Sequence, residues 1–223
     1  MSQTPDGKTW WITLSSLDFS KKYTYQFLVD GQLYIADPYA ELILDPQNDP
    51  ALGLASTVLP AYPATAHGIV GDLDLRAKSL SRKNNSFTNP AQGDLVIYEL
   101  LVRDFVKQHR YTTLKDSLTY LKRLGVNAVE LMPVQESEGN STWGYNPSFH
   151  RALDKYYGTK NDLKAYIDAC HENGIAVILD VVFNHAFGQS PLVQLYAENA
   201  HVSSDNPWFN TVAKHPFNVG FDF

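Results

Sequence analysis

An apolar run that ends in polar side chains is the first place in this sequence where chemistry is expected. Ile175 begins a continuous apolar stretch, which predicts a buried strand covered on both faces. Asp180, Asn184 and His185 lie at the carboxyl end of this run, where parallel α/β folds place their functional residues. A functional site is one interpretation of residues 178–185, and a strand followed by a polar, capped loop is the other.

The loop over residues 140–147 is a second candidate for function. Gly144 permits an unusual backbone angle, and Asn146-Pro147 favours a fixed turn. Such a loop can hold Trp143 and Tyr145 outward on a rigid scaffold, and ordered, exposed rings are suited to stacking against a sugar. The alternative for both rings is that they pack the loop onto its neighbours.

The elements that must position these residues begin near residue 93, where strands and helices alternate. Strands are expected at residues 95–101, 128–131 and 175–179, with a polar loop over 132–159. Helices are expected to begin at Thr113 and at Thr159 or Asn161, and to end at Gly125 and Gly174. Each strand-helix-strand unit implies parallel pairing with a right-handed crossover. Cys170 falls on the apolar face of the second helix, which predicts a core role.

Residues 1–45 have the pattern of β structure. Aromatic and apolar residues alternate with others over 23–29, and Asp30-Gly31 is typical of a hairpin turn. Two or three such strands do not make a stable unit alone. Residues 46–92 contain several prolines and little periodicity, so we expect an extended linker there.

Composition excludes several classes of partner. The 223 residues carry 18 basic and 24 acidic side chains, a net charge of −6, without a run of Lys or Arg, so nucleic acid is not an expected partner. No apolar stretch approaches the ~20 residues of a membrane span. The first residues lack the features of a signal peptide, so a cytoplasmic location is expected. A single cysteine excludes an internal disulfide.

Several of these segments together resemble the alpha-amylase family, glycoside hydrolase family 13. Residues 180–185 resemble its first conserved region, residues 98–105 resemble its first barrel strand, and residues 130–134 resemble the end of its second strand. The resemblance implies that residues 93–223 form the first three strands of a partial (β/α)8 barrel. Within the first strand, Glu99 and the Arg103-Asp104 pair are interpreted as a salt bridge, buried or at the rim, with a catalytic role as the alternative.

A looser resemblance covers the N-terminal residues. The Trp10-Trp11 strand, the Asp30-Gly31 turn and Asp37-Pro38-Tyr39 are similar to the last strands of the immunoglobulin-like β-sandwich module that precedes the barrel in branching enzymes and pullulanases. Residues 1–45 are therefore expected to be the tail of such a carbohydrate-binding-module-like domain.

The family resemblance also implies roles for individual residues. Tyr145 would stack on the sugar at subsite −1, with Trp143 nearby, and His185 would hydrogen-bond the same sugar. Asp180 would support the hydrogen-bond network of the site. Asn184 would be a ligand of a structural calcium ion, which we expect to be weakly bound or absent because one side-chain oxygen is far from the 6–8 that calcium takes.

The implied function is retaining glycoside hydrolysis or transglycosylation on α-1,4/α-1,6-glucans such as starch or glycogen. That mechanism needs a carboxylate nucleophile and an acid/base, and no residue of this sequence is assigned to either. Residues 220–223 superficially resemble the nucleophile motif, but they lack its arginine and a preceding strand.

We therefore expect an N-terminal fragment that is inactive alone, with the C-terminal part of the barrel as its missing partner, since such barrels need ~250 residues. The alternative is a non-catalytic glucan-binding or vestigial protein that keeps part of the −1 subsite. The choice between hydrolysis, branching and debranching depends on later loops.

Overall fold

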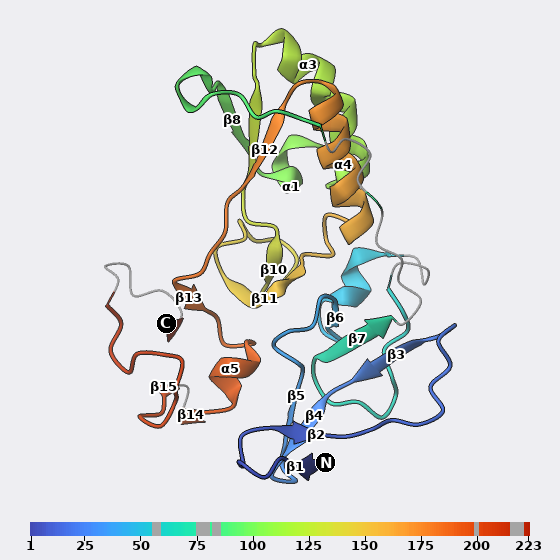
Figure 1. Cartoon of the computed structure of the whole chain (residues 1–223), viewed down its shortest axis with the longest axis vertical. Coiled ribbons are helices and arrows are strands. Elements are labelled where there is room, and N and C mark those ends of the chain that lie inside the picture. The colour runs from blue at the N-terminus through green and yellow to red at the C-terminus, as the bar shows by residue number, and fades with distance from the viewer. Residues whose placement is uncertain (55–58, 75–80, 82–85, 199–200, 215–220) are drawn as a thin grey trace.

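The computed structural model describes residues 1–223 except 55–58, 75–80, 82–85, 199–200 and 215–220. Figure 1 shows a strand-and-helix part above a group of small sheets formed by the N-terminal residues, with the segment after residue 185 beside them. The upper part contains the sheet from which the candidate residues extend.

That sheet has three parallel strands, β8 (Ile97–Leu100), β9 (Ala128–Leu131) and β12 (Ala176–Leu179). Their order is β12-β9-β8, and the last residues of all three strands align at Leu100, Leu131 and Leu179. The three predicted strands and their parallel pairing are therefore confirmed.

The helices on this sheet are α1 (Val102–Phe105), α2 (Tyr111–Leu114), the 3-10 turn η3 (Lys115–Ser117), α3 (Leu118–Arg123) and α4 (Lys160–Glu172). Thr159 begins α4 with a reciprocal capping box, and Gly125 and Gly174 follow their helices with φ of 81° and 75°. The predicted cap at Thr113 is wrong. Thr113 lies inside α2, where its hydroxyl bonds the Arg110 carbonyl at 3.0 Å.

The helices and strands share one apolar core, whose fully buried members include Tyr111, Leu114, Leu121, Val129, Leu131, Tyr166 and Ile175. Cys170 lies in this core with no exposed surface, as expected. The expectation that the third strand is covered on both faces is wrong at its carboxyl end, where Leu179 is 41% exposed. Among the described residues, β12 pairs on one side only, so its outer edge has no neighbouring strand to cover it.

The predicted polar loop over 132–159 is also wrong, because it contains a buried hairpin. β10 (Gln135–Ser137) pairs antiparallel with β11 (Pro147–Leu153). The register shifts twice along this pairing, so inward and outward positions do not alternate as they do in a regular strand. The sequence consequently gives no strand signal there.

The N-terminal residues form small antiparallel sheets. β1 (Ser2–Gln3) pairs with β2 (Trp10–Trp11), β4 (Phe27–Val29) pairs with β5 (Leu33–Ile35), and β7 (Val70–Asp74) lies between β3 (Lys22–Tyr25) and β6 (Ile43–Leu44). The predicted turn at Asp30-Gly31 is present, with φ of 51° and 68° at the two residues.

The structure differs from the linker expected over residues 46–92 at several points. β7 is the central strand of its sheet, and Val70 at its start is 1% exposed. The same segment contains the 3-10 turns η1 (Asp49–Leu52) and η2 (Gln92–Asp94). β7 forms a strand because it pairs with β3 on one side and β6 on the other, and this pairing with distant residues cannot be predicted from the local sequence.

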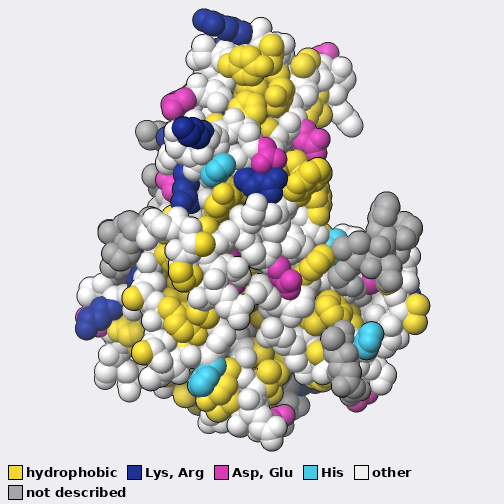
Figure 2. Space-filling view, turned by 180° about the vertical axis from the view of Figure 1, so that it is seen from behind, with side chains coloured by type: hydrophobic (Ala, Val, Ile, Leu, Met, Phe, Trp, Pro, Cys, Tyr) yellow, Lys and Arg dark blue, Asp and Glu magenta, His cyan; other side chains and the backbone are white. Residues whose placement is uncertain are grey.

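After β12 the chain leaves the parallel sheet. β13 (His185–Ala186) pairs with β16 (Phe221–Asp222), α5 (Pro191–Gln194) follows β13, and β14 (Ala197–Glu198) pairs with β15 (His201–Val202). Figure 2 shows charged side chains of both signs scattered over one face of the molecule. Within the described ranges, no helix is long and apolar enough to cross a membrane.

Candidate functional site

The loop before Tyr145 depends on Gly144. Its φ is 89°, a backbone conformation that side chains disfavour. A Cβ atom built on Gly144 would lie 2.5 Å from the carbonyl oxygen of Pro133, which lies two residues after the end of β9. The glycine therefore lets the loop approach the second strand closely, and Tyr145 is placed at the carboxyl end of the sheet.

Polar contacts fix the rest of this loop. The Arg103 guanidinium donates to the Thr142 carbonyl at 3.2 Å and also forms a two-pronged ion pair with Asp104. The Thr142 hydroxyl accepts from the Gly144 N–H at 3.0 Å and lies 2.7 Å from the Ser137 hydroxyl. The Arg103-Asp104 pair is therefore an ion pair that anchors the loop, as the salt-bridge interpretation predicts, whereas Glu99 forms no salt bridge with any described residue.

The structure brings together three of the predicted site residues. The Tyr145 hydroxyl donates to Asp180 Oδ2 at 2.5 Å. His185 Nε2 lies 2.8 Å from the carbonyl oxygen of Tyr145, so this nitrogen donates to the loop backbone. Asp180 immediately follows β12, and its own N–H donates to the Leu131 carbonyl at the end of β9. A phenol ring, a carboxylate and an imidazole therefore meet where two neighbouring strands end.

The surroundings keep the Tyr145 hydroxyl protonated. Partial burial, the hydrogen bond to Asp180, and the negative charges of Asp180, Glu99 and Glu130 all raise the pKa of Tyr145 well above its ordinary value. Glu99 and Glu130 are register partners on β8 and β9. Tyr145 is thus a fixed donor beside a region of negative charge, and its side chain remains 39% exposed.

Two residues that the sequence analysis missed position the segment before His185. The Gln135 side chain accepts from the Val182 N–H at 2.8 Å and donates to the His150 carbonyl at 3.2 Å. The His150 ring lies 3.1 Å from the His185 carbonyl through Nε2. Both residues belong to the β10–β11 hairpin, whose register shifts hide it from pattern analysis. This hairpin therefore connects the Tyr145 loop with the His185 segment.

Among the described residues, the side chains of Trp143 and Asn184 form no hydrogen bond with this group. The Trp143 side chain is 63% exposed. Asn184 is exposed too, and its backbone carbonyl accepts from the Phe223 N–H at 3.1 Å.

The described donor set does not fit a calcium site. Within the described part of the chain, no three His, Cys, Asp or Glu side chains converge to hold a metal ion. One exposed amide oxygen at Asn184 falls well short of the oxygen ligands that calcium requires. That calcium is weakly bound or absent at Asn184 remains a prediction.

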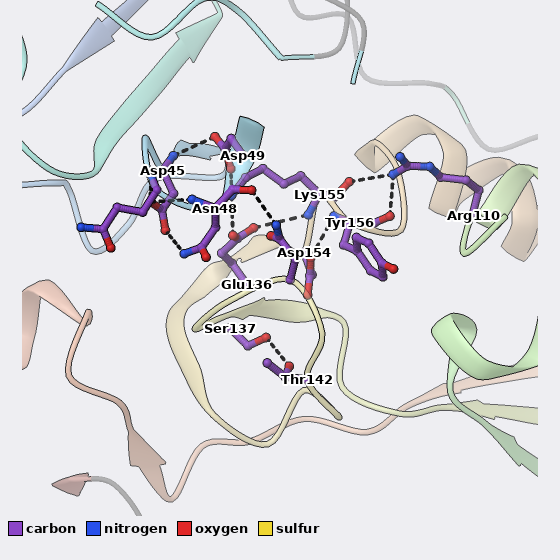
Figure 3. A network of polar contacts seen from close by, with 12 residues as sticks. Asp45, Asn48, Asp49, Arg110, Glu136, Ser137, Thr142, Asp154, Lys155 and Tyr156 are labelled. Carbon is purple, nitrogen blue, oxygen red and sulfur yellow. Dashed lines mark hydrogen bonds and ion pairs between the residues drawn. The ribbon is translucent and has the colours of Figure 1, made fainter. Parts of the chain in front are cut away.

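A buried ionic network lies between the hairpin and η1 (Figure 3). Lys155, which is 3% exposed, contacts Glu136 Oε1 and lies 3.1 Å from Asp49 Oδ1. Burial raises the pKa of Glu136 and of Asp49, although Lys155 opposes the shift. Burial also disfavours charged Lys155, but the two carboxylates outweigh this effect and raise its pKa. Because Asp49 comes from η1, the network joins the N-terminal sheets to the hairpin.

Comparison with known proteins gives a family match over the barrel part. Residues 111–220 match the model of the alpha amylase catalytic domain. A malto-oligosyltrehalose trehalohydrolase from Mycobacterium tuberculosis (strain H37Rv) is 34% identical over 208 residues, which cover 93% of this chain and 32% of that protein. The branching enzyme GlgB from Halothermothrix orenii is 35% identical over 100 residues, 45% of this chain and 14% of that protein.

Solved structures show the same relationship. A 1.4 Å structure from Salmonella typhimurium described as an alpha amylase aligns with a TM-score of 0.63 and 26% identity, covering 85% of this chain and 29% of the other. The GBS pullulanase SAP in complex with maltotetraose aligns with a TM-score of 0.50 and 25% identity, covering 69% and 23%. The chain spans about a third or less of the length of the curated relatives it matches.

Proposed function

The chain belongs to the alpha-amylase family, and we propose that it supplies the part of an α-glucan site that holds one glucose unit. The observation that carries this proposal is the convergence of Tyr145, Asp180 and His185 through hydrogen bonds of 2.5 and 2.8 Å. A glucose ring has an apolar face that suits the exposed phenol ring. Its hydroxyl groups suit the carboxylate and the imidazole.

Each side chain has a distinct role in this proposal. Tyr145 presents its ring for stacking, and its hydroxyl holds Asp180 in place. A sugar hydroxyl would take the place of the Tyr145 carbonyl as the acceptor for His185 Nε2. Trp143, exposed on the same loop, would contact the next sugar unit.

The charge of the site favours the chemistry of retaining glycosidases. Their transition state resembles an oxocarbenium ion and carries positive charge on the sugar. The carboxylates of Asp180, Glu99 and Glu130 all act on the ring of Tyr145, and they would attract such a charge. The nucleophile and the acid/base are not assigned to any of residues 1–223, so we propose that these residues alone bind glucan without turnover.

The relatives favour malto-oligosaccharide-type substrates. Several of them are malto-oligosyltrehalose trehalohydrolases, and others are a GlgX homologue and a branching enzyme. We further propose that residues 1–45 are the tail of an immunoglobulin-like β-sandwich, a proposal that the hairpin β4–β5 supports.

Binding of maltotriose to residues 1–223, followed residue by residue through backbone amide NMR shifts, tests this function. We expect shifts at Gly144 and Tyr145, and a loss of roughly tenfold in affinity for Tyr145→Ala. Tyr120→Ala, which removes a 53% exposed ring on α3, is the matched control and should change nothing. Unshifted amides around Gly144 at saturating maltotriose would overturn the proposal.

A reducing-sugar assay on starch, glycogen and pullulan tests the second half of the proposal. Purified residues 1–223 should give no product above the buffer blank. Turnover that disappears on Asp180→Asn would contradict the expectation that catalysis needs residues outside this chain.

A further inference from the structure

A cavity of about 510 Å³, whose lining includes none of Tyr145, Asp180 and His185, lies at the meeting point of five segments of the chain. Its lining comes from β5 and the following Ala36, from residues 45–47 and 67–69, from Phe149 of β11, and from Gln189, Pro191 and Gln194 in and just before α5. The volume is within the range of small-molecule sites, and such sites are frequent where separate parts of a fold meet.

Three of the six polar residues that line this cavity carry a side-chain amide. These three residues are Gln47, Gln189 and Gln194. Gln194 donates one hydrogen bond to the Gly188 carbonyl at 3.3 Å. Among the described residues, the Gln47 and Gln189 side chains make no hydrogen bond. An amide both donates and accepts, so three of them can bond to neighbouring hydroxyl groups.

Ionic ligands do not fit the lining. No Lys or Arg occurs among the described residues that line the cavity, so a phosphate or carboxylate ligand would have no cation to pair with. The carboxylate in the lining, Asp45, is 4% exposed. Its oxygens already accept from the N–H groups of Gln47 and Asn48 and from the Asn48 side chain. A neutral ligand with several hydroxyl groups therefore suits the cavity better than a charged one.

An aromatic pair gives the cavity a stacking surface. The rings of Tyr34 and His67 lie with their centroids 4.3 Å apart, and Tyr34 is 40% exposed. The Gln26 side chain holds the His67 backbone at both ends, since its amide donates to the His67 carbonyl at 2.7 Å and accepts from the His67 N–H at 3.1 Å. The backbone that carries the His67 ring is thereby held before any ligand arrives, which lowers the entropy cost of binding.

We propose that this cavity is a saccharide-binding site, separate from the Tyr145 site, in which Tyr34 stacks on a sugar ring and Gln47, Gln189 and Gln194 bond its hydroxyl groups. The inference goes beyond the proposed function and does not depend on it. A neutral oligosaccharide such as maltotriose is the ligand class that combines an apolar ring face with several hydroxyl groups.

The test uses residues 1–223 carrying Tyr145→Ala, so that the site on the parallel sheet is weakened. Maltotriose is titrated while backbone amide shifts of Gly68 and Ile69 and the side-chain amide of Gln194 are followed by NMR. We expect saturable shifts at these positions, and affinity weaker by roughly tenfold or more after Tyr34→Ala or Gln194→Ala. Glucose 6-phosphate should bind more weakly than glucose.

Tyr120→Ala serves as the matched control, and circular dichroism checks that each variant folds. Gln194 lies on α5, so its substitution tests the cavity without touching the ring pair. The proposal is overturned if maltotriose shifts no resonance at the cavity. It is also overturned if Tyr34→Ala and Gln194→Ala bind as the parent does, or if glucose 6-phosphate binds more tightly than glucose.

Discussion

Among single residues, Lys155 is the cation on which two buried carboxylates depend. The Glu136 side chain is only 9% exposed and the Asp49 side chain only 11%. A buried charge whose partner is removed costs far more than an exposed one, because water no longer solvates it.

We therefore expect Lys155→Met to lower the free energy of unfolding by about 3–5 kcal/mol, measured by urea denaturation. The matched control is Lys160→Met, which breaks an ion pair with Glu41 whose side chains are 52% and 62% exposed. It should cost less than about 1 kcal/mol. Equal effects of the two substitutions would show that the buried network contributes no more than a surface pair.

Protonation of His150 makes the free energy of unfolding depend on pH, and the direction of this dependence follows from the pKa shift of His150. Burial lowers the pKa of His150 below its ordinary value, so the unfolded chain binds its proton at a higher pH than the folded chain does. The contribution of neutral His150 to the free energy of unfolding is fully present above about pH 6.5. It is lost as the pH falls toward the lowered pKa of His150 in the folded chain.

Urea unfolding at about pH 7.5 and 5.5 should therefore show a stability loss that His150→Gln reduces. A glutamine amide can still donate to the His185 carbonyl but does not titrate. An unchanged slope between the two pH values would assign the dependence to other groups.

At the scale of elements, the Tyr145 loop depends on two separate requirements at Gly144. Its positive φ is one, and the close approach to Pro133 is the other. Gly139 in the same segment has a φ of 76° but no neighbour within 4 Å of a built Cβ. Substitution of Gly139 therefore measures the cost of backbone strain alone, whereas substitution of Gly144 adds the cost of steric overlap with Pro133.

Gly139→Ala should cost about 1–2 kcal/mol from the backbone alone. Gly144→Ala should cost about 1–3 kcal/mol more, because its Cβ must displace Pro133. Thermal and urea unfolding of the two variants provide the comparison. If the two costs agree, the contact with Pro133 relaxes without penalty.

The elements also show which features a sequence makes visible. α4 was predictable because its cap at Thr159 and its stop at Gly174 are local signals, and the glycine-turn pattern around Gly144 likewise marked the loop. The β10–β11 hairpin was not predictable, because its burial comes from distant partners and a shifted register. Among the site residues, Tyr145, Asp180 and His185 were found, whereas Gln135 and His150 lie on that hidden hairpin.

For the molecule as a whole, the parallel sheet has open edges. Among the described residues, β8 and β12 each pair on one side only, and Ile97 and Leu179 on them are 47% and 41% exposed. Open edges and exposed apolar side chains favour association between chains.

Residues 1–223 should therefore self-associate at micromolar concentration, as measured by light scattering. Ile97→Lys and Leu179→Lys should reduce the association, because a charge on an edge strand opposes pairing. Val212→Lys, at a 76% exposed position outside the sheet, is the control. A monomer with a sharp, cooperative unfolding transition would contradict this expectation.

The buried network in Figure 3 also has a consequence for the order of assembly during protein synthesis. Asp49 leaves the ribosome long before Glu136 and Lys155, with which it is later buried. Until Lys155 has emerged, the Asp49 carboxylate must remain in water, so the N-terminal sheets cannot close onto the hairpin. The nascent chain consequently exposes the junction between its two parts while translation covers the intervening residues, and a chaperone would have that interval in which to bind it.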